Sequence, residues 1–137
     1  MKKLTKAIAI ILLVTLMLIT NVTAFAADGE ITPRLSHIED GVFSFVATSS
    51  GGAISVTYFG YDSFARADLN VKIEKRSLLV LWNDVAEWNA SSTEVDGYFS
   101  HVFALNGSGT YRATFTLTVT GSDGTQEVVT ETIKSKY

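Results

Sequence analysis

The 137-residue chain contains no cysteine. It therefore cannot form a disulfide, carry a lipid on a lipobox cysteine, or use a thiolate as a nucleophile or metal ligand. Very small secreted domains usually need disulfides, whereas a chain of about 110 residues can bury roughly 65% of its unfolded surface. A folded domain in this chain has to be held together by its core alone.

Residue patterns that carry catalysis or metal binding are also sparse. The two histidines, His37 and His101, lack the close, repeated spacing of His, Asp and Glu that metal sites use. We interpret residues 37–40, HIED, as a solvated polar segment and His101 as a histidine on a sheet face. No G-x-S-x-G elbow, calcium loop or phosphate-binding glycine loop occurs. We therefore predict a protein that is not an enzyme, with no catalytic residue, no metal site and no cofactor.

The first 26 residues have the organisation of a secretory signal peptide. Three lysines lie within the first six residues, and residues 7–19 are apolar except for one threonine. Ala24-Phe25-Ala26 then supplies small residues for a cut between Ala26 and Ala27. The apolar stretch is shorter than the roughly 20 residues that a membrane span needs. The sequence therefore predicts a bacterial protein that is secreted to the extracellular space.

Removal of this segment changes the charge of the chain. The mature chain, residues 27–137, loses three lysines and no acidic residue, so its net charge falls from −3 to −6. An acidic chain without a Lys/Arg cluster on a periodic face argues against nucleic-acid binding. The same net charge should repel anionic membranes, so membrane contact is not expected after cleavage.

The rest of the chain has the pattern of an all-β protein. An extended lead-in over residues 27–40 precedes runs rich in valine, threonine and aromatic residues, separated by Gly/Ser/Asn turns. The clearer strands are expected at residues 41–48, 53–61, 68–76, 97–105, 110–120 and 125–134, with one more near residues 78–90. About seven strands favour one domain, residues 41–137, folded as an antiparallel two-sheet sandwich of immunoglobulin-like type. A small barrel is the alternative.

One local motif supports the immunoglobulin-like fold. Gly109-Thr110-Tyr111 enters a late strand, and a Gly-x-Tyr at this place resembles the tyrosine corner, in which the hydroxyl fastens the neighbouring loop. A plain core tyrosine is the other interpretation of Tyr111.

The segment LWNDVAEWNA, residues 81–90, holds both tryptophans and allows three local structures. In an unbroken strand, Trp82 and Trp88 have the same parity and share one face. In a helix, residues 78, 81, 82, 85 and 88 form one stripe. In a strand with a bulge or bend at Asn83-Asp84, the parity changes and the two rings face opposite ways. We favour a strand because the neighbouring segments are all β.

Several short motifs together resemble a group of small secreted β-sandwich proteins from Gram-positive bacteria whose function is unknown. These motifs are IEKR at residues 73–76, W-x-x-V-x-x-W over residues 82–88, GTYR at residues 109–112, SDG at residues 122–124 and the terminal tyrosine. The resemblance covers about residues 31–137, implies a secreted β-sandwich and brings no catalytic residue with it.

The chain departs from this group between the lysine-rich strand end and the first tryptophan. Members of the group tend to have a glycine/serine turn there, whereas this chain has Ser77-Leu78-Leu79-Val80-Leu81. If this link is the tip of a hairpin, it exposes four apolar residues beside Lys75 and Arg76.

These observations favour a non-catalytic interaction module that acts outside the cell or at a cell surface, on an unknown extracellular protein or glycan. Exposed aromatic rings could stack on sugars or anchor a protein, although a core without disulfides also needs them inside. The candidate contact residues are Trp82, Trp88, Leu79 and Val80. The alternative function is a small secreted membrane-active or bacteriocin-like antagonistic protein, suggested by the apolar link next to Lys75-Arg76.

We predict that a Gram-positive expression host releases a chain that begins at Ala27, because the small residues at positions 24 and 26 direct the peptidase to that bond. Intact-mass spectrometry of the protein in the culture medium checks this. Recovery of a chain that still begins at Met1 in the membrane fraction would contradict it.

Overall fold

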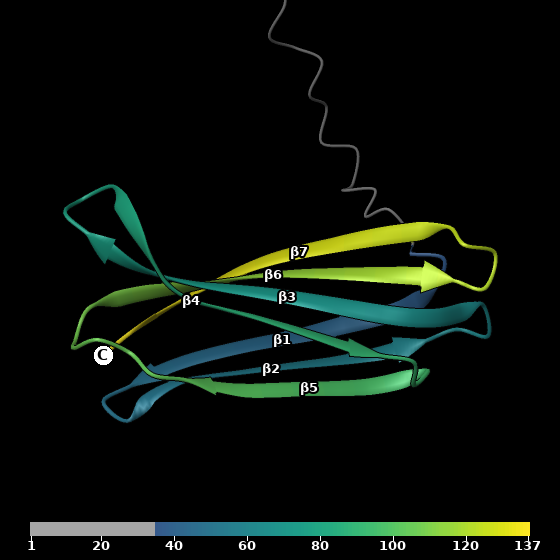
Figure 1. Cartoon of the computed structure of the whole chain (residues 1–137), viewed down its shortest axis with the longest axis horizontal. Coiled ribbons are helices and arrows are strands. Elements are labelled where there is room, and N and C mark those ends of the chain that lie inside the picture. Colours follow the sequence, from purple (N-terminus) through teal and green to yellow (C-terminus); the bar gives the residue numbers. More distant parts are fainter. Residues whose placement is uncertain (1–34) are drawn as a thin grey trace, which may run out of the picture. The chain divides into compact units, whose positions relative to one another are not determined.

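The computed structural model describes residues 35–137, so Ala26, Ala27 and the expected cleavage site lie outside the described residues. Residues 35–137 contain no helix, and hence none that is long and apolar enough to cross a membrane. They form seven strands (Figure 1). The strands are β1 (Ile38–Thr48), β2 (Gly51–Gly60), β3 (Phe64–Ser77), β4 (Leu81–Ser92), β5 (Asp96–Phe103), β6 (Thr110–Gly121) and β7 (Gln126–Lys136).

The strands build two antiparallel sheets, which confirms the predicted sandwich of about seven strands. One sheet has the order β1-β2-β5 and the other the order β4-β3-β6-β7. In a constant-type immunoglobulin domain the fourth strand pairs with the fifth, whereas β4 here pairs with β3. Residues 78–80 separate β3 from β4 and close an antiparallel hairpin between them.

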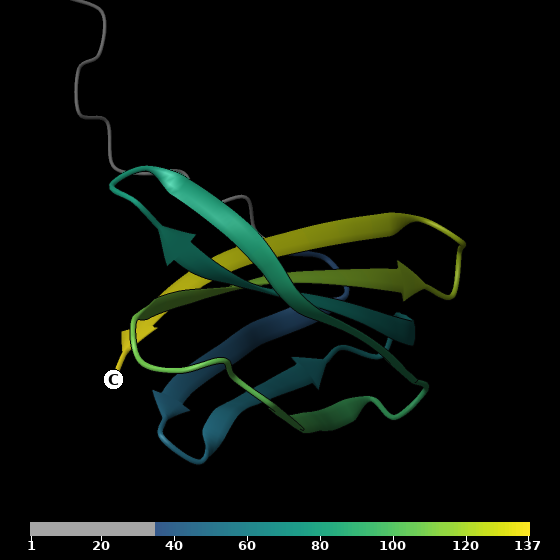
Figure 2. The ribbon, with the colours of Figure 1, turned by 60° about the vertical axis from the view of Figure 1, so that its left-hand side comes forward.

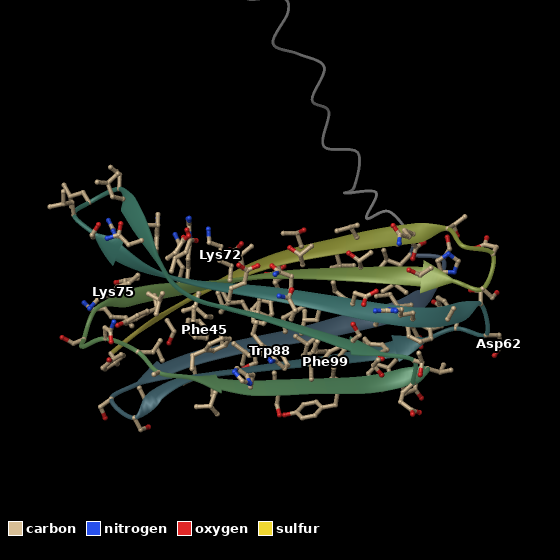
Figure 3. The ribbon with its side chains drawn as sticks, viewed as in Figure 1. Phe45, Asp62, Lys72, Lys75, Trp88 and Phe99 are labelled. Carbon is tan, nitrogen blue, oxygen red and sulfur yellow. The ribbon has the colours of Figure 1, made fainter. Side chains whose placement is uncertain are left out.

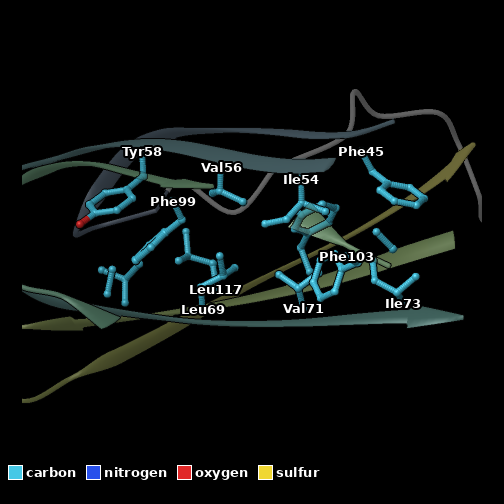
Figure 4. Packing of buried hydrophobic residues seen from close by; sticks show 14 of the residues in the cluster. Phe45, Ile54, Val56, Tyr58, Leu69, Val71, Ile73, Phe99, Phe103 and Leu117 are labelled. Carbon is cyan, nitrogen blue, oxygen red and sulfur yellow. The ribbon is translucent and has the colours of Figure 1, made fainter. Parts of the chain in front are cut away.

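The core lies between the two sheets and follows from the alternation of apolar residues along each strand. Strand β6 is the clearest case, because every second residue from Tyr111 to Val119 is buried. Figure 4 shows residues of the facing sheet, among them Ile54, Val56 and Phe99, against Leu69 and Val71. Alternate residues along each strand therefore face the core, as expected for an antiparallel strand with one buried face.

The starts of β1 and β3 lie clearly earlier than the sequence pattern indicates. β1 starts at Ile38, so the last residues of the expected lead-in belong to the sandwich. β3 starts at Phe64 instead of residue 68, because Phe64 stacks on Tyr58 with ring centroids 5.5 Å apart and Ala67 is fully buried. A register irregularity between Phe64 and Arg66 disturbs the alternation there, which hides this part of the strand in the sequence.

The tyrosine corner is confirmed. Tyr111 is fully buried, and its hydroxyl lies 2.9 Å from the carbonyl oxygen of Asn106 and 2.7 Å from that of Gly107. The ring of Tyr137 stacks on that of Tyr111, and the Tyr137 hydroxyl also donates to Gly107. Lys75 donates to Asn106 from β3. The loop before β6 is therefore fastened to β3, to β6 and to the residue that follows β7, at one end of the sandwich.

We predict that Tyr111→Phe lowers the free energy of unfolding by about 1–3 kcal/mol, because it removes the hydroxyl that satisfies two loop carbonyls. Urea denaturation followed by circular dichroism measures the loss. Tyr98→Phe is the matched control, since Tyr98 is exposed on β5 and should unfold like the parent. Equal midpoints for Tyr111→Phe and the parent would show that the corner contributes nothing to stability.

Candidate functional site

The hairpin tip, residues 78–81, is the most exposed apolar feature of the described residues. Leu78 and Leu79 are each 81% exposed, Val80 is 79% exposed and Leu81 is 53% exposed. Figures 1 and 2 show that the ends of β3 and β4 extend beyond the body of the sandwich. The sequence-based prediction that this link exposes four apolar residues is confirmed.

Leu78 holds a backbone conformation that a leucine rarely adopts. Its φ is +54°, in the left-handed region, and it is the one residue other than glycine with positive φ among residues 35–137. A non-glycine residue in this region costs roughly 1–2 kcal/mol. Glycine would close the same turn without that cost. Both the strain and the exposed isobutyl group therefore point to a role for this residue outside folding.

Polar contacts hold the hairpin in one shape while the apolar side chains face solvent. The Arg76 guanidinium donates twice to the carbonyl oxygen of Leu79, over 3.0 Å from Nε and 2.6 Å from Nη2. The Asn83 amide donates to the Ser77 hydroxyl over 3.0 Å across the two strands. The carbonyl group of Leu79 is thus hydrogen-bonded within the hairpin. The turn backbone is held in place while its aliphatic side chains remain exposed.

A bulge in β4 separates the two tryptophans. Ile73 pairs with Ala86 while the next residue, Glu74, pairs with Asp84, so Val85 is an extra residue on β4. The bulged-strand interpretation of residues 78–90 is therefore confirmed, one residue beyond Asn83-Asp84. In an unbroken strand Asp84 would share the core face with Trp88, and burying its carboxylate would be costly. The bulge places Asp84 on the outer face of the sheet, and Trp82, two residues earlier, lies on the same outer face.

Trp88 packs on the core side of its sheet. It lies opposite the fully buried Val71, and its ring stacks on His101 of β5 with centroids 4.6 Å apart and planes 8° apart. His101 in turn meets the edge of Phe103 at 4.8 Å. Trp88 thus connects β4 to β5, two edge strands of different sheets that are not paired with each other. It is partly buried and packs against the core. Figure 3 shows its position between the sheets.

Trp82 lies on the outer face of the four-stranded sheet, next to the hairpin tip. The Arg112 guanidinium lies 4.3 Å from the centre of its ring, and Lys134 Nζ lies 5.8 Å away. Arg112 also donates from Nε to Glu74 Oε2 over 2.5 Å, and this hydrogen bond raises the pKa of Arg112. The ring is therefore held against permanent positive charge by cation–π contacts.

The four candidate contact residues do not form one site. Leu79, Val80 and Trp82 lie at the tip end of the β3–β4 hairpin, whereas Trp88, farther along β4, faces the core. Leu78 belongs to the same surface but was not among the candidates, because sequence alone does not reveal its φ of +54°. The exposed run of Leu and Val beside Lys75-Arg76 was the signal that could have found it.

Positive charge gathers at the end of the sandwich that carries the hairpin tip. Six of the seven Lys and Arg residues in the described part of the chain form this cationic end: Lys72, Lys75, Arg76, Arg112, Lys134 and Lys136. The strand register places them in neighbouring rows of β3, β6 and β7. Three acids, Glu74, Asp84 and Glu87, lie among them. Glu74 pairs with Arg112, Asp84 pairs with Lys72, and Glu87 lies opposite Lys72 in the strand register. Within residues 35–137, the other four cations have no carboxylate within 4.0 Å.

Negative charge gathers at the opposite end. The acidic end consists of Glu39, Asp40, Asp62, Glu94, Asp96, Asp123 and Glu127, on the loops and strand ends around residues 37–40, 59–64, 92–96 and 121–127. Figure 3 shows Asp62 and Lys75 at opposite ends of the sandwich. The described domain is therefore electrically polarised along its strands, a property that its net charge does not reveal.

His37 is not part of a solvated segment, which corrects the sequence-based interpretation. It is 5% exposed, and its ring nitrogens lie 2.9 Å from Ser63 Oγ and 2.7 Å from Thr125 Oγ1. A Cβ on Gly121 would lie 2.3 Å from this ring, so glycine permits the close approach. His37 thus ties the start of β1 to two loops at the acidic end. Across residues 35–137, no group of three or more His, Asp or Glu side chains is placed to hold a metal ion.

The outer face of the three-stranded sheet is a second exposed surface, and it differs from the hairpin tip in chemistry. A shallow depression there is lined by small and hydroxyl-bearing side chains such as Ser44, Ala53 and Ser100, together with Tyr98. Val42, Val46 and Val102 are exposed on β1 and β5, and the register places Val46, Ala53 and Val102 in one row across the sheet. Exposed aliphatic side chains on a solvated sheet face are common, because much of a folded protein's surface is apolar. This face therefore provides matched control positions for the tip.

No family model and no curated protein matches this sequence. Among solved structures, the soluble domain of PmoD from Methylocystis sp. ATCC 49242 (Rockwell) is similar at 17% identity and a TM-score of 0.36, over 63% of this chain and 74% of that chain. A family 76 glycoside hydrolase from a bovine Bacteroides thetaiotaomicron strain is similar at 11% identity and a TM-score of 0.35, over 74% of this chain. This chain spans 20% of the length of that hydrolase. Similarity at this level carries no conclusion about function.

The two tryptophans should respond differently to truncation. We predict that Trp88→Ala lowers the free energy of unfolding by about 2–4 kcal/mol, since it leaves a void beside the core, and Trp82→Ala by about 1 kcal/mol or less. Each variant retains one tryptophan as a reporter. The emission of Trp88 should be blue-shifted and poorly quenched by acrylamide, and that of Trp82 redder and well quenched. Identical spectra and equal losses would contradict the bulge in β4.

Proposed function

We propose that this protein is an exported, non-catalytic interaction module that acts at a cell surface through its hairpin tip. Export is supported by the signal-like first 26 residues. The resemblance to small secreted β-sandwich proteins of Gram-positive bacteria agrees with this role. The sandwich supplies a rigid support, and the partner-binding residues are Leu78, Leu79, Val80 and the neighbouring Trp82.

The observation that carries this proposal is the chemistry of the tip. A three-residue hairpin connection needs no apolar side chain, and polar or glycine residues usually occupy such turns. This chain instead exposes four aliphatic residues, one of them in a strained left-handed conformation. Both features reduce the solubility and stability of the free protein. They are explained if the tip is covered by a partner when the protein acts.

The test replaces the three apolar residues of the turn by glycine and serine, which are common in solvent-exposed turns. The variant Leu78→Gly, Leu79→Ser, Val80→Ser keeps the backbone bond from Arg76 to residue 79 and relieves the strain at residue 78. We expect its melting temperature to equal or exceed that of the parent. Binding of the purified, fluorescently labelled chain to washed Gram-positive cells should fall at least about 10-fold, the equivalent of roughly 1.4 kcal/mol.

The matched control is Val42→Thr, Val46→Thr, Val102→Thr, which also makes three exposed aliphatic positions polar but on the three-stranded sheet. It should bind cells like the parent. Equal cell binding by the parent and the tip variant, or no saturable binding by the parent, would contradict the proposed function.

A further inference from the structure

The hairpin tip and the cationic end together define the kind of partner. Resting on the function proposed above, we infer that the tip docks on an anionic lipid surface. The residues of the tip enter the boundary between headgroups and acyl chains, the cationic end contacts the headgroups, and the acidic end points away from the membrane.

The shape of the tip favours a lipid surface over a protein. Four aliphatic side chains on a convex turn cover much less than the roughly 800 Å² per partner of a standard protein interface. A protein would need a groove shaped to receive them, and in a symmetric pair a second copy presents another convex tip. A bilayer needs no complementary groove, because its interior is a deformable apolar solvent directly beneath a polar layer.

The order of residue types along the hairpin matches the order of layers in a membrane surface. The aliphatic residues 78–81 come first, and Arg76 follows at the root of the turn, where it pairs across the strands with Trp82. Trp82 is three residues from Leu79, about 10 Å along an extended strand. With the tip in the acyl boundary, Trp82 lies at headgroup depth, where tryptophan is enriched because it has an apolar body and a polar edge.

The position of the cations provides charge complementarity. Arg112 and Lys134 lie against the Trp82 ring, and Arg76 lies two residues from Leu78. Lysine and arginine this close to the tip would reach phosphate groups within a Debye length of about 8–10 Å. Each such cation strengthens binding to an anionic surface by roughly 5-fold.

The net charge of −6 expected for the mature chain argued against membrane contact, but that argument assumes evenly spread charge. In the described domain most cations and most acids lie at opposite ends of the strands, although Glu74, Asp84 and Glu87 lie among the cations. An anionic surface attracts the near end and repels the far end, so it orients the molecule with the tip facing the lipid. The acidic end also prevents the protein from lying flat on the membrane.

The experiment uses the purified chain and vesicles of two compositions, phosphatidylcholine alone and equal parts of phosphatidylcholine and phosphatidylglycerol. Flotation measures the bound fraction. We expect binding at least about 10-fold stronger to the phosphatidylglycerol vesicles, weakened by salt. The Gly-Ser-Ser tip variant should lose on the order of 100-fold, since it removes most of the hydrocarbon that enters the bilayer. Equal binding of the tip variant and the parent would overturn the inference.

The charge test compares two single substitutions that change the net charge equally. Lys134→Gln removes a cation beside Trp82, and Arg66→Gln removes a cation on the far half of β3. Lys134→Gln should weaken vesicle binding roughly 5-fold and Arg66→Gln less than about 2-fold. Equal losses would show that net charge alone controls binding, and would overturn the docking orientation.

Trp82 reports the docking depth. In a Trp88→Phe background it is the sole tryptophan, and its emission should shift to the blue on phosphatidylglycerol vesicles and be quenched by lipids brominated near the headgroup. The vesicles should not leak, because a single hairpin tip is too short to cross a hydrocarbon core of about 30 Å. An unshifted spectrum with bound protein would overturn the insertion of the tip.

Two further outcomes separate this inference from the proposed function. Tip-dependent binding to cells without binding to either vesicle would overturn the lipid surface and leave the interaction module intact, with a protein or glycan as its partner. A tip-dependent dimer in sedimentation equilibrium, again without vesicle binding, would instead identify a second copy as the occupant. If neither cells nor vesicles bind through the tip, both proposals are wrong.

Discussion

The contact between the two sheets is the interaction on which the rest of this structure depends. No cysteine is present to cross-link the chain, so stability comes from aliphatic and aromatic side chains that alternate inward along the strands, as Leu117 does against the opposite sheet. That alternation leaves little freedom to β4, where an unbroken strand would bury Asp84. The extra residue Val85 keeps the carboxylate outside, and it thereby places Trp82 on the outer face and Trp88 inside.

The hairpin tip departs from this rule, because its aliphatic side chains face solvent instead of the core. Within residues 35–137, the other exposed large apolar side chains are 46–69% exposed, whereas the consecutive residues Leu78, Leu79 and Val80 are each 79–81% exposed. The support beneath them is well ordered, since Arg76 binds the turn carbonyl and Arg112 holds the Trp82 ring. A rigid support under an unprotected apolar surface is the arrangement of a docking element, because it reduces the entropy lost on binding.

The end of the domain that carries the hairpin tip is also positively charged. Antiparallel strands place the end of β3, the start of β6 and the end of β7 side by side, so residues far apart in the sequence, such as Lys75 and Lys134, share one end. The same pairing gathers Asp62, Asp96 and Asp123 at the other end. Hydrocarbon and positive charge thus coincide at the tip, and the proposed lipid docking depends on that coincidence.

The sequence by itself determined the all-β class, a count of about seven strands and the apolar character of the link before Trp82, and it favoured the sandwich and the tyrosine corner at Tyr111. These follow from period-two alternation, turn residues and short-range spacing, which a chain carries in its local order. Only the tertiary structure decided which strand β4 joins, where the bulge lies, that His37 is buried, and that most cations and most acids lie at opposite ends. Each of these depends on how strands distant in the sequence pair with one another. The local residue pattern does not specify which residues of two such strands will lie opposite each other.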